Sequence, residues 1–305
     1  MRKLFAAALL AATPLASHAW GRTGHMIINH IACEKLPADL PAFLRSPAAC
    51  TQMEYQGPEP DRWRSKATEP ELVAAQAPEH FIDLEWAAYA GSPLPRNRYD
   101  FIRALAAAQP QHPDIQLTPE KVGLQPYVTT EVWERLKSAM RDYRALEKDH
   151  KDTKPVEALI VYYAGWLGHY VADGSQPLHT SIQYNGWTGP NPNGYTTEHK
   201  IHSKFESTYV LNNIKESDVA SKVPAAPVPH GDIFDDYMGY LNATNKLVEK
   251  TYQLEKARGF DDAGTPEGKA FTIERLAAGA TELRDLIVFA WQASAVPLPP
   301  SKYAD

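Results

Sequence analysis

The amino-acid sequence predicts an all-α fold, a single multi-helix domain. Apolar residues recur at three- and four-residue spacing in several long segments, as on the buried face of a helix. Segments that alternate strictly between apolar and polar residues are scarce, so little sheet is expected. The connections are rich in proline and glycine but are too short for an interdomain linker. These connections are Ser46–Pro60, Gln109–Pro126, Asn185–Gly194 and Val223–Gly231.

Each expected helix has one apolar face, and two prolines mark the ends of the helix in the middle of the chain. Pro155 suits its first turn, where an amide hydrogen would have no partner within the helix. Pro177 follows the same helix and prevents its continuation. In chain order, the expected helices are His25–Lys35, Arg98–Ala108, Thr129–Glu147, Pro155–Ala172, Glu198–Asn212, Asp232–Lys256 and Lys269–Ala293.

The first nineteen residues have the pattern of a cleaved secretory signal. The basic start Met1–Lys3 is followed by the apolar run LFAAALLAATPLA, with small residues Ser17 and Ala19 before the expected cleavage site. The apolar run is too short to span a bilayer. Cleavage before Trp20 would leave residues 20–305 as one all-α domain, secreted or exported to a periplasm.

Net charge and cysteine content exclude few functions. A net charge of −6 provides no basic field of the kind that general duplex-DNA binding needs. Divalent cations bound in a pocket would make its local charge positive, so the negative net charge does not exclude a polyanionic substrate. Cys33 and Cys50 could form one disulfide in an oxidising compartment or stay two separate buried thiols. Nothing in the pattern implies a stable protein partner.

Two histidine–carboxylate pairs with helical spacing dominate the functional signal. His169 and Asp173 are four residues apart and face the same way on a helix. His179 follows the helix-ending proline and can turn back toward them. His202 and Glu206 repeat the four-residue spacing downstream. Imidazole and carboxylate together are ligands that a borderline metal such as zinc prefers.

Earlier segments offer further donors, each with a structural alternative. Asp61 could bind a metal and Arg64 a phosphate, or the segment is a solvated charge run. His80 could be a ligand, Phe81 could stack on a flat ligand and Asp83 could bind its polar groups. The alternative is an amphipathic core segment. His112, His150 and His230 are in loops or at helix ends and are expected to be solvated.

The new N-terminus adds a different kind of donor. Cleavage before Trp20 would create a free amine that can chelate a metal with the adjacent carbonyl, close to His25. The alternative is a terminal aromatic packed on the surface. Nine residues then supply nitrogen or oxygen donors, none of them cysteine, which suits three divalent ions with positions left for water and phosphate. They are Trp20, His25, Asp61, His80, His169, Asp173, His179, His202 and Glu206.

The motifs, taken in order, resemble the trinuclear zinc nucleases specific for single strands, of the fungal nuclease P-one and S-one type. The motifs are WGRTGH, D-x-x-R at Asp61, HFID at His80, the histidine–aspartate–histidine run at His169 and H-x-x-x-E at His202. That family shares its all-helical fold with the zinc-dependent phospholipases C. The resemblance implies hydrolysis of single-stranded RNA and DNA to 5′-phosphorylated products by a metal-activated water. No protein nucleophile is then needed, and no G-x-S-x-G motif is present.

The resemblance also implies a role for each donor. One zinc ion would be held by Asp61, His80, His169 and Asp173. A second would be held by Trp20 and His25 and would share Asp173. The third would be held by His179, His202 and Glu206. Arg64 would stabilise charge on the phosphate, and Phe81 and Asp83 would stack on and recognise a base.

Two departures from the nuclease pattern keep a second substrate class open. The nucleases usually have aspartate where this chain has Glu206, and the Gly-Gly-Asn element between His179 and His202 is missing. The alternative is therefore a phospholipase C acting on phosphatidylcholine-like lipids. A helical protein that only stores metal is a third hypothesis, but it would leave Arg64 without a use. The Arg64 and HFID matches favour a nucleic acid or nucleotide substrate.

Overall fold

The computed structural model describes residues 20–64 and 67–298, which form helices and the turns between them. No strand occurs in these ranges, where two isolated bridges join Ile82 to Gly123 and Tyr184 to Gly186. The predicted all-α class is confirmed. Within the same ranges, no helix is long and apolar enough to cross a membrane. The expected signal peptide, residues 1–19, lies outside the described residues.

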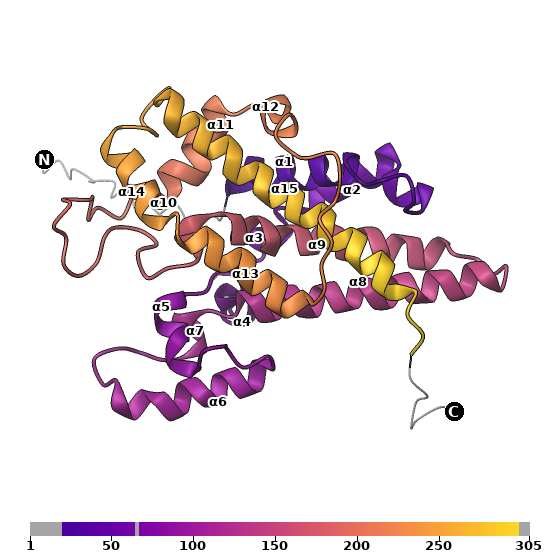
Figure 1. Cartoon of the computed structure of the whole chain (residues 1–305), viewed down its shortest axis with the longest axis horizontal. Helices are drawn as coiled ribbons and strands as arrows, with labels where there is room; N and C mark the ends of the chain where they lie inside the picture. Colours follow the sequence, from indigo (N-terminus) through magenta and orange to yellow (C-terminus); the bar gives the residue numbers. More distant parts are fainter. Residues whose placement is uncertain (1–19, 65–66, 299–305) are drawn as a thin grey trace, which may run out of the picture.

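Long helices form the centre of the molecule and short ones surround it (Figure 1). The long helices are α1 (Gly21–Glu34), α8 (Gln125–Lys148), α9 (Lys154–Ser175), α13 (Ile233–Asn245) and α15 (Pro266–Ser294). Those of intermediate length are α2 (Pro47–Gln56), α6 (Arg98–Ala108) and α14 (Val248–Lys256). The short ones are α3 (Glu59–Arg62), α4 (Pro70–Gln76), α5 (Leu84–Ala87), α7 (Pro119–Val122), α10 (Ile201–Ser203), α11 (Val210–Asn213) and α12 (Glu216–Ala220). A π-helical segment, Lys204–Tyr209, joins α10 to α11.

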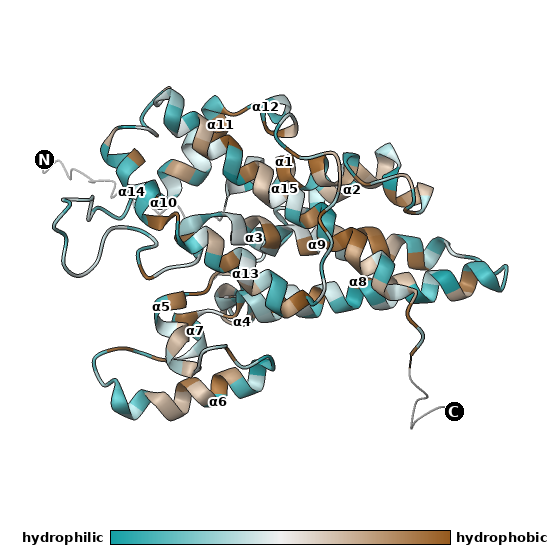
Figure 2. Cartoon of the chain, in the orientation of Figure 1, coloured by the Kyte–Doolittle hydropathy of each residue, from teal (hydrophilic) through white to brown (hydrophobic). Residues whose placement is uncertain are grey.

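Helix α9 is the central element, because α1, α2, α8, α13 and α15 all pack on it. It pairs with α8 as a helical hairpin, and α15 crosses both (Figure 1). Nearly every residue in its C-terminal half is buried, and Figure 2 shows apolar residues in the part of α9 nearer the α8–α9 turn. His169 and Asp173, in this half, are both fully buried. Polar groups so placed need strong compensating partners.

Close packing at glycines fixes α1 and α2 against α9. A Cβ atom on Gly168 would come within 2.1 Å of Asn29 Oδ1, so only glycine allows this approach. The Asn29 amide donates hydrogen bonds to the carbonyls of Met53 on α2 (2.9 Å) and Gly165 on α9 (2.8 Å). One buried amide thus ties three helices together and sets the position of α1 relative to α9.

Two cysteines and two prolines act as local constraints on these helices. Cys33 and Cys50 form a disulfide between α1 and α2, which settles the alternative that the sequence left open. Pro155 lies in the first turn of α9, as predicted. Pro177 follows the end of α9 and opens a short 3-10 turn, Pro177–His179, which directs the chain back toward the centre.

The structure corrects several expected boundaries. The segment Ser46–Pro60 is not a loop, because it contains α2 and the start of α3; the Ser46 hydroxyl caps α2 by accepting a hydrogen bond from the amide of Ala49 (3.2 Å). The expected helix Asp232–Lys256 is two helices, since α13 ends at Asn245 and α14 begins at Val248. The helix Arg98–Ala108 is confirmed with its predicted bounds.

Candidate metal centre

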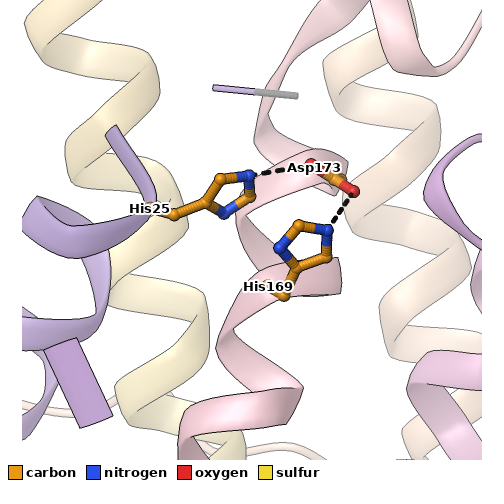
Figure 3. A group of neighbouring side chains, drawn as sticks. All are labelled: His25, His169 and Asp173. Atoms are coloured by element: carbon orange, nitrogen blue, oxygen red, sulfur yellow. Dashed lines mark ion pairs between the residues drawn. The ribbon is translucent and has the colours of Figure 1, made fainter. Parts of the chain in front are cut away.

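The two α9 donors meet a third from α1. His169 Nε2 lies 3.4 Å from Asp173 Oδ2, and His25 Nε2 lies 3.4 Å from Asp173 Oδ1. Figure 3 shows the two imidazoles side by side with the carboxylate reaching across both. The ring centroids are 4.2 Å apart and the ring planes are nearly parallel. Each oxygen of Asp173 therefore faces a different histidine.

Four histidines are oriented by backbone carbonyls in the same way. In each, Nδ1–H donates to a carbonyl oxygen: His169 to Gly57 (2.8 Å), His80 to Gln76 (3.0 Å), His179 to His80 (2.6 Å) and His202 to Tyr184 (2.8 Å). This bond fixes the tautomer and leaves Nε2 as the acceptor, an arrangement typical of histidines that bind metals. Four such histidines in one centre are hard to explain by packing alone.

Asp61, at the end of α3, approaches two histidines from another side. Its Oδ1 lies 3.8 Å from His80 Nε2 and its Oδ2 lies 3.9 Å from His25 Nε2. Asp61 and His80 form one compact donor group with His169, and His25 forms another with His169 and Asp173. The structure thus brings together residues from α1, α3, α9 and the turn after α4.

The third compact group contains His179, His202 and Glu206. His202 Nε2 lies 2.9 Å from Glu206 Oε2 and 3.1 Å from His179 Nε2. Glu206 belongs to the π-helical segment, a local widening that is frequent at functional sites. Its Oε2 also accepts a hydrogen bond from the side-chain amide of Gln176 (3.0 Å). Gln176 was not predicted; no spacing rule in the sequence indicates it.

Trp20 is a buried residue rather than a terminal aromatic on the surface. Its side chain is fully buried and packs on Phe205, with ring centroids 5.2 Å apart. The indole nitrogen donates to the Ser175 hydroxyl at the end of α9 (2.7 Å). These contacts hold the start of α1 beside the centre, five residues before His25.

Burial and the repulsion between carboxylates shift the pKa values of several donors in the centre. Burial raises the pKa of Asp173 well above its usual value, and the carboxylates of Asp61 and Glu206 raise it further. Burial also lowers the pKa of His80 to about 3, so its imidazole is neutral, the form that binds metal. At Glu206 burial raises the pKa, but His202 and His179 outweigh it and the net shift is downward.

Several donor atoms in the centre have no hydrogen bond to satisfy them. Among the described residues, no group hydrogen-bonds to Nε2 of His80 or His169, to either oxygen of Asp173 or to Oε1 of Glu206. Buried polar atoms without partners are costly and rare. Nitrogen and oxygen donors aimed at shared spaces, without thiolate, fit divalent ions of the borderline class.

A cleft of about 380 Å³ opens from the centre. Three of the predicted residues, Arg64, Phe81 and Asp83, line it beside His80. Arg64 Nη1 lies 3.5 Å from Asp61 Oδ1, and the Arg64 side chain is 27% exposed. Burial raises the pKa of Asp83 to about 8, with a smaller contribution from Glu85, so this carboxyl can stay protonated near neutral pH.

The sequence reasoning missed other residues that line the same cleft. Trp86, Lys121 and Tyr184 are among them, with Ile182. The aromatic signal of Trp86 was available five residues after Phe81, but nothing local indicated that Lys121 reaches the cleft. Its place depends on the amide of Asp83 donating to the carbonyl of Val122 (2.7 Å), which docks α7 beside the HFID segment.

A helical core with buried imidazole and carboxylate donors, opening into a cleft with an arginine and aromatic rings, defines a class of metal-dependent hydrolases acting on phosphate esters. Within that class, the chain belongs to the S1/P1 nuclease family, whose model matches residues 20–265. It is therefore a phosphodiester hydrolase whose substrate is nucleic acid, in a metal-dependent and typically secreted family. No curated protein and no solved structure matched the chain.

Proposed function

We propose that the protein is a secreted, zinc-dependent phosphodiesterase that hydrolyses single-stranded RNA and DNA to 5′-phosphorylated products. The observation that carries this proposal is the convergence of three buried donor groups beside the cleft that contains Arg64 and Phe81. The donors are imidazole nitrogens and carboxylate oxygens, which zinc accepts equally well.

The proposed ligand sets overlap with the three geometric groups, and Trp20 is added to them. Asp61, His80, His169 and Asp173 would hold one zinc ion. Trp20, through its amine and carbonyl, and His25 would hold a second, with Asp173 shared between the two. His179, His202 and Glu206 would hold the third. The two oxygens of Asp173, which face His169 and His25 separately, support its proposed bridging role.

Three residues of the cleft would act on the substrate directly. Arg64 would bind the non-bridging oxygens of the phosphate through its guanidinium. Phe81 would stack on a base, and the neutral carboxyl of Asp83 would donate or accept hydrogen bonds at the edge of that base. Bound zinc ions would supply an acidified water and neutralise charge on the phosphate and leaving oxygen.

The cleft favours single strands for a physical reason. Stacking on Phe81 requires a base face, and in a duplex both faces of a base are covered by its neighbours. A single strand can turn one base into the cleft at little cost. The net charge of −6 also provides no basic track for a duplex backbone.

Export is supported by two observations. The family match begins at Trp20, where the expected mature chain would start. The disulfide between Cys33 and Cys50 is of a kind that persists in oxidising compartments. We therefore propose that the signal peptide is removed before Trp20 and that the enzyme acts in the periplasm or outside the cell.

The test is a substrate panel on natively processed protein reconstituted with zinc. Hydrolysis of single-stranded RNA and DNA, abolished by a chelator and restored by zinc, is expected, with 5′-phosphate on the products. The matched arm is phosphatidylcholine in micelles, in which release of phosphocholine would favour the phospholipase C alternative. Absence of chelator-sensitive cleavage of single strands would contradict the proposal.

A further inference from the structure

A surface of aromatic and arginine side chains lies next to the metal centre and outside the cleft. We call it the Trp166 surface, and it consists of Tyr55, Arg62, Trp63, Arg135, Tyr162 and Trp166. Tyr55 is 56% exposed and Tyr162 is 37% exposed. The two tryptophans are half-buried and the two arginines are exposed. Large rings gathered in contact with water mark binding surfaces more often than single exposed residues do.

Three of the four rings form a series of ring contacts, and a guanidinium lies over Tyr55 and over Trp166. The Trp166 ring lies 5.9 Å from that of Tyr162 and 6.0 Å from that of Trp63, the second pair meeting edge to face. The Arg62 guanidinium lies 4.2 Å from the centre of the Tyr55 ring, and that of Arg135 lies 5.9 Å from the centre of the Trp166 ring. A ligand that stacks here meets rings that are already ordered.

The elements that build this surface continue into the metal centre. Along α9, Tyr162, Trp166, His169 and Asp173 follow one another at steps of four, three and four, and therefore share one helix face. Tyr162 and His169 are about 10 Å apart along the axis. From the other side, Trp63 directly precedes Arg64, which lines the cleft.

Hydrogen bonds connect the two regions as well. The Trp166 indole nitrogen donates to the Tyr170 hydroxyl (3.3 Å), which in turn donates to Glu79 Oε2 (3.2 Å), next to His80 in the chain. The Tyr170 and His80 rings are 6.0 Å apart. A strand whose phosphate lies at the centre can therefore reach the Trp166 surface with its next nucleotides.

The charges of the surface suit a polyanion. Glu59 pairs with Arg62 and accepts a hydrogen bond from the Trp63 indole (3.1 Å), so Arg62 is already compensated. No carboxylate among the described residues pairs with Arg135. Ring faces beside an uncompensated guanidinium are the chemistry that binds single-stranded nucleic acid without sequence preference.

We propose that the Trp166 surface is an extended binding site for single-stranded substrate. Bases beyond the one in the cleft stack on Tyr162 and Trp166, and the backbone phosphate between them pairs with Arg135. This inference rests on the proposed function, because it requires a nucleic acid substrate. It predicts that long strands are cleaved more efficiently than dinucleotides.

The experiment compares a dinucleotide with a long single-stranded oligonucleotide, using zinc-loaded wild type and the variants Tyr162→Ala, Arg135→Ala and Trp166→Ala. The ratio of kcat/KM for the long substrate to that for the dinucleotide is expected to fall about fivefold or more in Tyr162→Ala and Trp166→Ala, mainly through KM. Arg135→Ala is expected to weaken binding of the long strand and to reduce the salt dependence of that binding by about one phosphate contact.

The matched control is Tyr99→Ala, because Tyr99 is an exposed tyrosine (66%) on α6 and takes no part in either site. An unchanged ratio in folded Tyr162→Ala and Arg135→Ala would overturn the proposal and indicate that the surface binds another partner. An equal loss on both substrates in Trp166→Ala would also overturn it, since it would mean that the ring only supports His169. Failure of the wild type on both substrates would instead overturn the proposed function.

Discussion

Two clusters of buried charged groups lie in this molecule, and they are balanced in different ways. The metal centre contains three carboxylates and five imidazoles, and burial lowers the pKa of two of these, His80 and His169. Several of its donor atoms have no hydrogen bond to any described residue. The second cluster lies where the segment that precedes α13 packs on α15, and it contains Arg284, Asp285, His230 and Glu282. There Arg284 is fully buried, pairs with Asp285 at 2.7 Å and donates to the carbonyl of Ala226 (3.2 Å).

The difference lies in where the positive charge comes from. In the second cluster His230 Nε2 and Glu282 Oε1 also lack a hydrogen bond, but the charges there are balanced. Arg284 pairs with Asp285, and burial raises the pKa of Glu282 to about 8, so no added cation is needed near neutral pH. Beside the three buried carboxylates of the metal centre lies Arg64, which is 27% exposed, contacts Asp61 at 3.5 Å and also lines the cleft. Burial by itself therefore does not define a metal site; a shortage of charge together with aligned donor atoms does.

The largest effect is expected from Asp173→Asn, which keeps the shape of the side chain but removes the proposed bridge. Activity on single strands should fall by at least about a hundredfold, the loss seen even for partners one step removed from a metal. After chelation the variant should be more stable than the wild type at neutral pH, because asparagine is neutral, whereas Asp173 must either carry its charge in the buried centre or take up a proton on folding. Steady-state kinetics, elemental analysis and thermal unfolding with chelator measure the three effects. Full metal content and activity would contradict the bridging role.

The next effect concerns the N-terminus. A form with one residue added before Trp20 is expected to lose one zinc ion and most of its activity, because the terminal amine no longer exists at that position. Elemental analysis and activity of extended and native forms, matched for folding by circular dichroism, decide the question. Full activity in a form shown by mass spectrometry to retain the extra residue would exclude Trp20 as a ligand.

Arg64→Lys tests whether the arginine at the edge of the centre serves the substrate. Lysine keeps the charge but cannot pair with two phosphate oxygens at once, so kcat/KM should fall by about tenfold, or roughly 1.4 kcal/mol. Metal content should not change. A loss of zinc in this variant would show that Arg64 holds Asp61 in place rather than the phosphate.

The smallest effect on activity is expected in the second cluster, where Glu282→Gln should instead change stability. Burial, with Asp285 and Asp236, raises the pKa of Glu282 to about 8. The folded protein thus holds this proton over a range in which the unfolded chain releases it. The protonated Glu282 carboxyl makes its full contribution to the free energy of unfolding below about pH 4.3, the pKa of glutamate in the unfolded chain. That contribution is lost as pH rises through the folded pKa of about 8, by up to about 1.4 kcal/mol per pH unit.

Glutamine is neutral at every pH, so the variant should gain stability relative to wild type between about pH 5 and about pH 8. Urea unfolding of both proteins at these two pH values measures the change. An equal difference at both pH values would show that Glu282 titrates normally.

The same cluster corrects the expectation that His230 is solvated, since its side chain is only 9% exposed and lies 3.5 Å from Asp236.

The sequence anticipated which donor residues lie close together better than it anticipated the connections. Pairs such as His169 with Asp173 follow from helix geometry, which four-residue spacing reveals directly. Helix α2 was missed because its short sequence has almost no apolar periodicity and is flanked by proline and glycine. The break between α13 and α14 has no proline or glycine to announce it, so only packing against neighbouring helices decides it.

The sequence by itself determined the helical class, the α9 donor pair, the turn at Pro177 and the set of donor residue types, because these depend on local periodicity and on side-chain chemistry. Only the tertiary structure decided which atoms face one another. The carbonyls of Gly57, His80 and Tyr184 select the tautomers of His169, His179 and His202, and the Asn29 amide brings α1 to α9. Such contacts join residues far apart in the chain, where no spacing rule applies, and they form only when the core has packed.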